Sequence, residues 1–205
     1  MAAGLRVAVD VQHIHRPPGS KHARDRGSLY ALANGTTITE ASAAMTYAAA
    51  LSSYLRAHGA TVLDNDPAHG VFVGFYSQRN AAATAWKAHA YLACHINSGR
   101  GSYAAMEYMS TTIGAELAQA IAPRLREAFP TLILNAKTVS LSTDQRGSDC
   151  IERVGPSCAA VLCEPFFGDN PRHQSLLASP ELVKVGEAIG QGVVEWWRTR
   201  QTAVG

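Results

Sequence analysis

The stretch Tyr91-Leu92-Ala93-Cys94-His95-Ile96-Asn97 decides the predicted fold. It begins as an apolar run of strand length and ends by presenting one imidazole beside a polar loop. Open α/β sheets bury apolar strands of this kind and place their chemistry at the carboxyl ends of the strands. The position of His95 therefore predicts a functional site at that edge of the sheet.

Length and composition describe an ordinary globular protein. The 205 residues fit one domain, with 47% hydrophobic and 17% charged residues. A net charge of +2 without a Lys/Arg block predicts no nucleic-acid partner. The N-terminus lacks a basic leader followed by an apolar segment, and no apolar run approaches the roughly 20 residues of a membrane helix. We therefore expect no membrane partner and a protein made in the cytoplasm without a signal peptide.

The four cysteines are too few and too scattered for a disulfide framework, and no Cys-x-x-Cys pair occurs. Cys94 and Cys163 lie inside apolar runs, where a free cysteine is usually a small core residue. Cys150 and Cys158 flank a loop, and their pairing under oxidising conditions stays open.

Hydrophobic periodicity predicts strands that alternate with helices. The expected strands are residues 5–10, 61–63, 91–97, 104–109 and 159–163, and the expected helices are 41–58, 77–89, 112–128 and 180–200. This order predicts an α/β fold, a single domain with a mostly parallel central sheet and helices on both faces. Pro123 is expected to kink or shorten its helix. Residues 16–39 are predicted to form a long loop, and residues 131–157 show no clear pattern.

Four chemically suitable residues lie at one side of this predicted sheet. His13, His95 and Glu164 stand at the carboxyl ends of buried strands, and Glu40 lies in the first turn of a helix capped by Thr39. Two histidines and a glutamate are a ligand set that catalytic zinc prefers. A further carboxylate can take a proton from water and pass it to a leaving amine. Glu164 suits this role because its apolar neighbours should raise its pKa.

Simpler interpretations stay open for each residue. His15 could face the same side as His13 and bind the metal in its place. An isolated histidine is more often a surface or core residue, Glu40 could only match the helix dipole, and Glu164 could be a salt-bridge partner. The remaining histidines are expected at the surface: His22, His58, His69, His89 and His173.

The order and spacing of several short motifs resemble the zinc-dependent N-acetylmuramoyl-L-alanine amidases, a family of bacterial cell-wall amidases and phage endolysins. The resemblance spans about residues 6–198. The motifs that carry it are Asp10-Val11-Gln12-His13, Glu40, Arg79-Asn80, Cys94-His95-Ile96-Asn97, Glu107-Tyr108, and Val161-Leu162-Cys163-Glu164 followed by Phe167 and Asn170.

The resemblance implies that His13, Glu40 and His95 bind one zinc ion and that Glu164 is the catalytic carboxylate. The implied reaction is hydrolysis of the amide between the lactyl group of N-acetylmuramic acid and L-alanine in peptidoglycan. Three departures concern the shape of the substrate loop. Gln12 replaces the glycine usual before the first histidine, Ile14-His15 replaces a Gly-Gly pair, and Cys94 replaces a serine.

Further residues are expected to support the site or touch substrate: Arg79, Asn97, Glu107 and His15. Arg79 either only starts a helix or braces a ligand carboxylate. Glu107 is open between a solvent-facing and a supporting role. Tyr108, Trp196 and Trp197 are expected to pack rather than to bind sugar.

We therefore expect one amidase catalytic domain over residues 1–205, without a separate cell-wall-binding domain, and a monomer that acts on bacterial peptidoglycan. An endolysin released from the cytoplasm fits this expectation, and a secreted enzyme fits it if a leader has been removed. The alternatives are a zinc peptidase or deacylase with the same metal site and a non-catalytic cell-wall-binding module.

Overall fold

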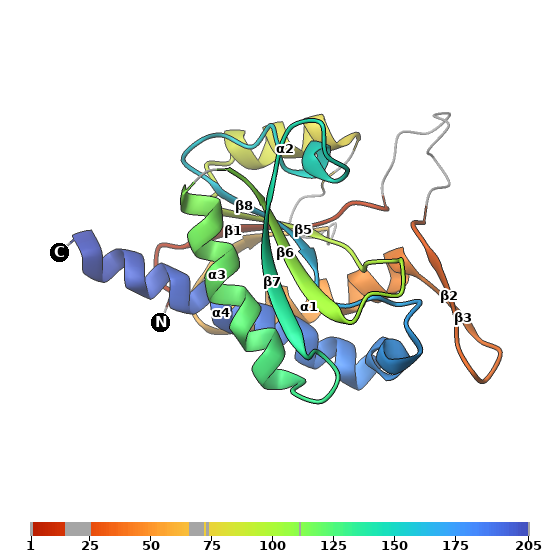
Figure 1. The fold of residues 1–205 in the computed structure, drawn as a ribbon. Helices are drawn as coiled ribbons and strands as arrows, with labels where there is room; N and C mark the ends of the chain where they lie inside the picture. Colours follow the sequence, from red (N-terminus) through yellow and green to blue (C-terminus); the bar gives the residue numbers. More distant parts are fainter. Residues whose placement is uncertain (1, 15–25, 66–71, 73, 111, 205) are drawn as a thin grey trace.

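The computed structural model describes residues 2–14, 26–65, 72, 74–110 and 112–204. Its sheet has six strands: β1 (Arg6–Val11), β4 (Thr61–Leu63), β5 (Ala90–Cys94), β6 (Tyr103–Met109), β7 (Asn135–Leu141) and β8 (Ala159–Glu164). Their spatial order is β4-β1-β5-β8-β6-β7 (Figure 1). β4, β1, β5 and β8 run parallel, whereas β6 pairs antiparallel with β8 and parallel with β7. The predicted α/β class with a mostly parallel sheet is confirmed.

The register of the central strands aligns their carboxyl ends. Val11 of β1 pairs with Cys94 of β5, and Cys94 pairs with Cys163 of β8. The residues that follow these three positions therefore leave the sheet at the same level. This alignment brings His13, His95 and Glu164 to one edge.

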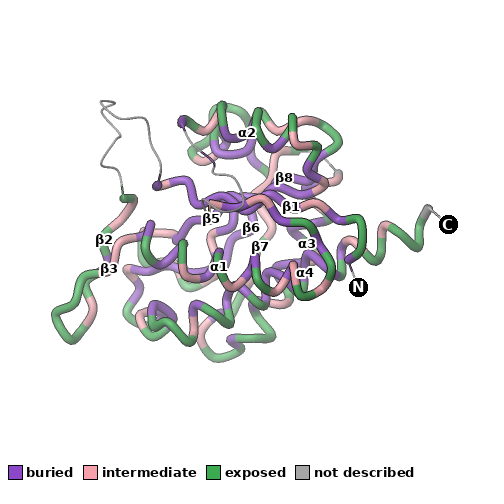
Figure 2. Tube along the Cα trace, turned by 180° about the vertical axis from the view of Figure 1, so that it is seen from behind, coloured by how far each residue is buried: buried purple, intermediate pink, exposed green. Residues whose placement is uncertain are grey.

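Helices cover both faces of the sheet. α1 (Glu40–Ala57), α3 (Thr112–Ala128) and α4 (Ser179–Val204) pack on one face, and α2 (Tyr76–Ala85) lies on the other (Figures 1 and 2). Successive strand residues point to opposite faces, so Leu92 and Cys94 join the larger apolar core while Tyr91 and Ala93 join the smaller one beneath α2. Because both faces are covered, β5 is buried along its whole length.

The order of β4, β1 and β5 creates a switch point in the sheet. From β1 the chain passes through α1 to β4 on one side, and it returns through α2 to β5 on the other side. α1 and α2 lie on opposite faces, and a cleft lined by His13, Glu40 and His95 lies at the carboxyl ends of β1 and β5, where ligands bind in open α/β sheets. His13 and His95 follow these two strands.

Local sequence explains where α1 begins and ends. The Thr39 side chain accepts a hydrogen bond from the Ser42 amide at 3.1 Å, which caps the first turn and makes Glu40 the first helical residue. Gly59 adopts a φ of 90° just beyond the helix, a conformation that favours glycine. The predicted helix of residues 41–58 is confirmed to within one residue at each end.

Three structural predictions need correction. Residues 135–141 form β7, an edge strand whose mixed exposure leaves no apolar run to detect. The predicted loop of residues 16–39 contains a two-stranded hairpin, β2 (Leu29–Ala31) with β3 (Thr37–Thr39), although residues 15–25 lie outside the described residues. α3 continues through Pro123 to Ala128, so the proline does not shorten it.

The prediction that His173 lies at the surface is also wrong. Its side chain is buried, Nδ1 accepts a hydrogen bond from the Phe167 amide at 3.1 Å, and Nε2 donates to the Leu132 carbonyl at 3.0 Å. His173 thus ties two loops together as a satisfied core residue.

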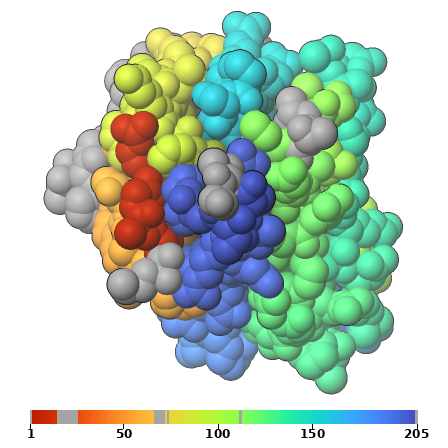
Figure 3. Space-filling view, turned by 90° about the vertical axis from the view of Figure 1, so that its left-hand side faces the viewer, coloured from red at the N-terminus to blue at the C-terminus, as the bar shows by residue number. Residues whose placement is uncertain are grey.

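The N-terminal residues of the described chain lie beside the C-terminal part of α4 (Figure 3). The first residues pack against the end of α4 (Figure 3), and Trp197 Nε1 donates to the Ala3 carbonyl at 3.3 Å. All four cysteines are buried, and Cys150 and Cys158 form no disulfide with each other in this structure. Within the described residues, no helix has the length and apolar character needed to cross a membrane.

Candidate metal centre and catalytic cleft

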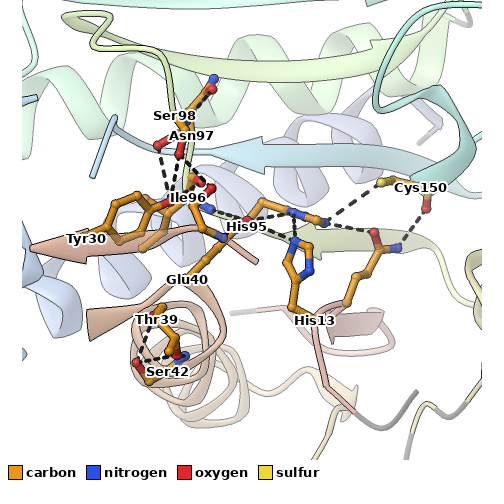
Figure 4. Close-up of polar contacts among 12 residues, drawn as sticks. His13, Tyr30, Thr39, Glu40, Ser42, His95, Ile96, Asn97, Ser98 and Cys150 are labelled. Atoms are coloured by element: carbon orange, nitrogen blue, oxygen red, sulfur yellow. Dashed lines mark hydrogen bonds and ion pairs between the residues drawn. The ribbon is translucent and has the colours of Figure 1, made fainter. Parts of the chain in front are cut away.

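Three donor atoms from distant segments converge at the edge of the sheet (Figure 4). His13 Nε2 lies 3.2 Å from His95 Nδ1 and 3.2 Å from Glu40 Oε1. His95 Nδ1 lies 3.0 Å from Glu40 Oε1. The structure therefore brings together the three residues that the sequence predicted as metal ligands, and within the described residues they form a group able to hold a metal ion.

Backbone contacts hold Glu40 and His95 in this arrangement. Glu40 Oε2 accepts a hydrogen bond from the Ser28 amide at 2.9 Å, and Oε1 accepts one from the Ile96 amide at 3.3 Å. The His95 amide donates to the Cys163 carbonyl at 3.1 Å, which continues the β5–β8 ladder by one residue. Gly27 has a φ of 70° and lies so close to Glu40 that a side chain there would collide with the carboxylate.

The electrostatics of the three groups suit a cation. Burial alone would raise the pKa of Glu40, but hydrogen bonds and charge interactions with His13 and His95 lower it below its ordinary value. Burial lowers the pKa of His95, although Glu40 opposes this shift. A carboxylate beside a neutral imidazole offers lone pairs in a small volume, and this is the donor chemistry of divalent zinc sites.

Glu164 stands apart from this group in the same cleft of about 450 Å³. Glu164 is half-buried at the end of β8, and its Oε2 atom is buried with no hydrogen-bond partner among the described residues. Burial raises its pKa well above the ordinary value, and the neighbouring carboxylates Glu40 and Glu107 add to this effect. An unpartnered carboxyl oxygen with a raised pKa is suited to receive and return a proton.

The lining of the cleft carries further charges. Glu107 on β6 lines the cleft, and burial raises its pKa. Arg146 also lines the cleft, and its positive charge lowers the pKa of both Glu107 and Glu164. The cleft therefore contains a cation close to two carboxyl groups.

The supporting residues predicted from the sequence have different surroundings. Asn97 and Glu107 line the cleft. Arg79 is fully buried and does not brace Glu40; it forms an ion pair with Asp10 at 2.5 Å. His15 lies outside the described residues.

Sequence reasoning missed several residues of the site, because their side chains meet only after folding: Gln12, Gly27, Tyr91, Arg146 and Cys150. Strand alternation was an available signal for Tyr91, since Asp10 and Tyr91 occupy the same face of adjacent strands.

A donor set able to hold a cation, in one cleft with a half-buried carboxyl group at the switch point of an α/β sheet, is typical of metal-dependent hydrolases. Residues 7–195 match the family described as N-acetylmuramoyl-L-alanine amidase. The chain belongs to this family, and it is an N-acetylmuramoyl-L-alanine amidase, an enzyme class that acts on peptidoglycan.

Solved structures of amidases share the fold. Cwp6 from Clostridium difficile matches with a TM-score of 0.72 and 21% identity over 95% of this chain, which covers only 30% of Cwp6. The amidase Ami1 from Mycobacterium smegmatis matches with a TM-score of 0.74 and 18% identity, over 97% of this chain and 99% of Ami1. The catalytic domain of the CD27L endolysin targeting Clostridia difficile matches with a TM-score of 0.61 and 17% identity, over 93% of this chain and 97% of that domain. A comparison with curated protein sequences gives no match.

Proposed function

We propose that His13, Glu40 and His95 hold one zinc ion, and that Glu164 is the acid–base residue of an amidase that cleaves the bond between N-acetylmuramic acid and L-alanine. The observation that carries this proposal is the convergence of three donor atoms within 3.0–3.2 Å of one another, in the same cleft as Glu164 Oε2, which has no hydrogen-bond partner among the described residues.

The spacing of the donor atoms fits zinc. A tetrahedral ion with nitrogen and oxygen ligands at about 2.0–2.2 Å separates its ligands by about 3.3–3.6 Å. The observed separations of 3.0–3.2 Å are only slightly shorter. Three protein ligands also leave a fourth position open, as catalytic zinc sites require. When bound, zinc would acidify a water molecule and polarise the amide carbonyl.

Glu164 moves the proton in this proposal. Its Oε2 atom accepts a proton from the attacking water and then donates it to the amide nitrogen of L-alanine as the carbon–nitrogen bond breaks. The water oxygen remains on the lactyl carbonyl carbon, so the products are a free carboxyl group and a free amino group. The raised pKa of Glu164 supports both steps, because the same group must be a base first and an acid afterwards.

The test combines metal analysis with digestion of purified sacculi. We expect about one zinc ion per chain and soluble stem peptides that begin with a free L-alanine amino group. His95→Ala should lose the zinc, whereas His58→Ala, at a half-buried histidine stacked on Tyr54, should keep it.

Three results would contradict the proposal. Full activity after complete removal of metal would exclude the zinc role. Fragments with other new amino termini would indicate a peptidase, and binding to sacculi without release of peptide would indicate a non-catalytic module.

We also propose that the enzyme acts at the cell wall as a monomer without a nucleic-acid partner. The chain belongs to a family that acts on peptidoglycan, and this supports the cell wall as its place of action. Light scattering of the purified protein should give the mass of a single chain.

A further inference from the structure

We propose that Gln12 is a positioning residue of the metal centre: it keeps a hydrogen atom on Nε2 of His95, so that Nδ1 faces the metal position as a lone pair. This inference rests on the proposed zinc site. Gln12 is one of the positions at which this sequence departs from the motifs that it resembles.

The hydrogen-bond chain starts at a buried ion pair. Arg79 Nη1 donates to Asp10 Oδ1 at 2.5 Å, and Tyr91 Oη donates to Asp10 Oδ2 at 2.7 Å. An ionised carboxylate can only accept hydrogen bonds. The single hydroxyl hydrogen of Tyr91 is therefore committed to Asp10, and the Tyr91 oxygen is left to accept.

Because the Tyr91 oxygen can only accept a hydrogen bond, it determines which way the Gln12 amide points. Gln12 Nε2 donates to Tyr91 Oη at 2.8 Å and to the Cys150 carbonyl at 3.0 Å. Both partners accept, so the two amide hydrogens are used and the amide cannot flip without losing both bonds. The carbonyl oxygen of Gln12 must then face His95.

The orientation of Gln12 in turn determines the hydrogen on His95. Gln12 Oε1 lies 3.0 Å from His95 Nε2, and a carbonyl oxygen only accepts, so Nε2 must donate. His95 Nδ1, on the other side of the ring, faces Glu40 Oε1 and His13 Nε2 (Figure 4). Cys150 Sγ lies 4.0 Å from Nε2 and is a second, weaker neighbour.

The same chain also holds the segment that carries His13. Arg79 donates to the carbonyl groups of Val11 and Ile14, on either side of Gln12 and His13. Asp10, Gln12, Arg79 and Tyr91 are all fully buried, so water does not compete for their hydrogen bonds. Partners that orient a metal-bound histidine typically change metal affinity 10- to 100-fold when they are removed.

The test compares Gln12→Met, which keeps the length of the side chain but removes the amide, with the control Gln174→Met. Among the described residues, the Gln174 side chain donates one hydrogen bond, to the carbonyl of the exposed Ala31 at 3.0 Å. Nitrogen-15 NMR of the histidine rings locates the hydrogen on His95, and competition with a chelator gives the Kd for zinc. Thermal unfolding of the zinc-free proteins shows that each variant is folded.

In the wild type we expect a hydrogen on Nε2 of His95 with and without zinc. In zinc-free Gln12→Met, Nε2 loses its acceptor and the hydrogen moves to Nδ1, where Glu40 accepts it. Zinc must then displace that hydrogen, so the Kd should rise about 10- to 100-fold, while Gln174→Met should match the wild type.

Tyr91→Phe provides a second route in case Gln12→Met does not fold. It removes the hydroxyl that orients the Gln12 amide, so it should shift the hydrogen on His95 in the same direction by a smaller amount.

A wild-type His95 with its only hydrogen on Nδ1 would overturn the inference. Folded Gln12→Met and Tyr91→Phe variants that keep the hydrogen on Nε2 of His95 and bind zinc with a Kd within about twofold of the wild type would also overturn it. Failure of the wild type to bind zinc would instead contradict the proposed function, and the zinc-free spectra would still test Gln12.

Discussion

Cys94 and Cys163 are direct register partners on the parallel strands β5 and β8, so the residues that follow them, His95 just beyond β5 and Glu164 at the last position of β8, lie side by side. One of the two is a proposed metal ligand and the other the proposed acid–base group. Their proximity results from backbone pairing between buried strands, and it does not depend on flexible loops.

Glu164→Gln should separate catalysis from metal binding. The amide keeps the shape of the side chain but cannot accept a proton, so we expect a loss of about 10²–10⁴-fold in kcat with bound zinc unchanged. Release of stem peptides from sacculi and metal analysis measure the two effects. Glu187→Gln, at an exposed position of α4, is the matched control and should keep full activity. Full turnover by Glu164→Gln would refute the assigned role.

The same substitution should stabilise the zinc-free protein at neutral pH. The folded-state pKa of Glu164 is raised, so the unfolded chain releases this proton first, and stability falls as pH rises above the ordinary value of 4.5. Glu164→Gln removes this loss, and each 1 kcal/mol gained raises Tm by about 2–4 °C in a protein of this size. Calorimetry should show a higher Tm for the variant at pH 7 and no difference below about pH 4. If the variant and the wild type had the same Tm at pH 7 as well as below pH 4, the raised pKa of Glu164 would be contradicted.

Gly27→Ala should weaken zinc binding through Glu40. The added methyl group collides with the Glu40 carboxylate, and the φ of 70° strains any side chain by about 1–2 kcal/mol. Gly35→Ala is the matched control, because Gly35 has a φ of 82° but open space around its Cβ position. Both variants should lose stability, but only Gly27→Ala should raise the Kd for zinc. Equal affinities in the two variants would show that the contact with Glu40 is unimportant.

Arg79→Met should destabilise the whole domain. It leaves the buried Asp10 carboxylate without its cationic partner, and breaking a buried pair in this way typically costs about 3–5 kcal/mol. Denaturant unfolding measures the loss. The double variant Asp10→Asn with Arg79→Met removes the uncompensated charge, so it should be more stable than Arg79→Met alone. The opposite order would mean that Asp10 is not charged in the folded protein.

The elements predicted correctly are those whose signal is local. β1, β5 and β8 are continuous apolar runs, and α1 and α3 repeat apolar residues every three or four positions between clear start and stop signals. β7 was missed because an edge strand needs no continuous apolar run, and its exposed and half-buried residues resemble a loop.

The residues of the site also divide into those with a local sequence signal and those without one. The sequence by itself determined that His13, His95 and Glu164 stand at strand ends and that Glu40 opens a helix, because burial and helix capping depend on neighbouring residues. Only the tertiary structure decided which side chains touch. Gln12 meets Tyr91 across 79 positions, and Arg79 meets Asp10 across 69. Such partners follow from strand register and from the packing of α2, both of which depend on the whole chain, so no local pattern contains them.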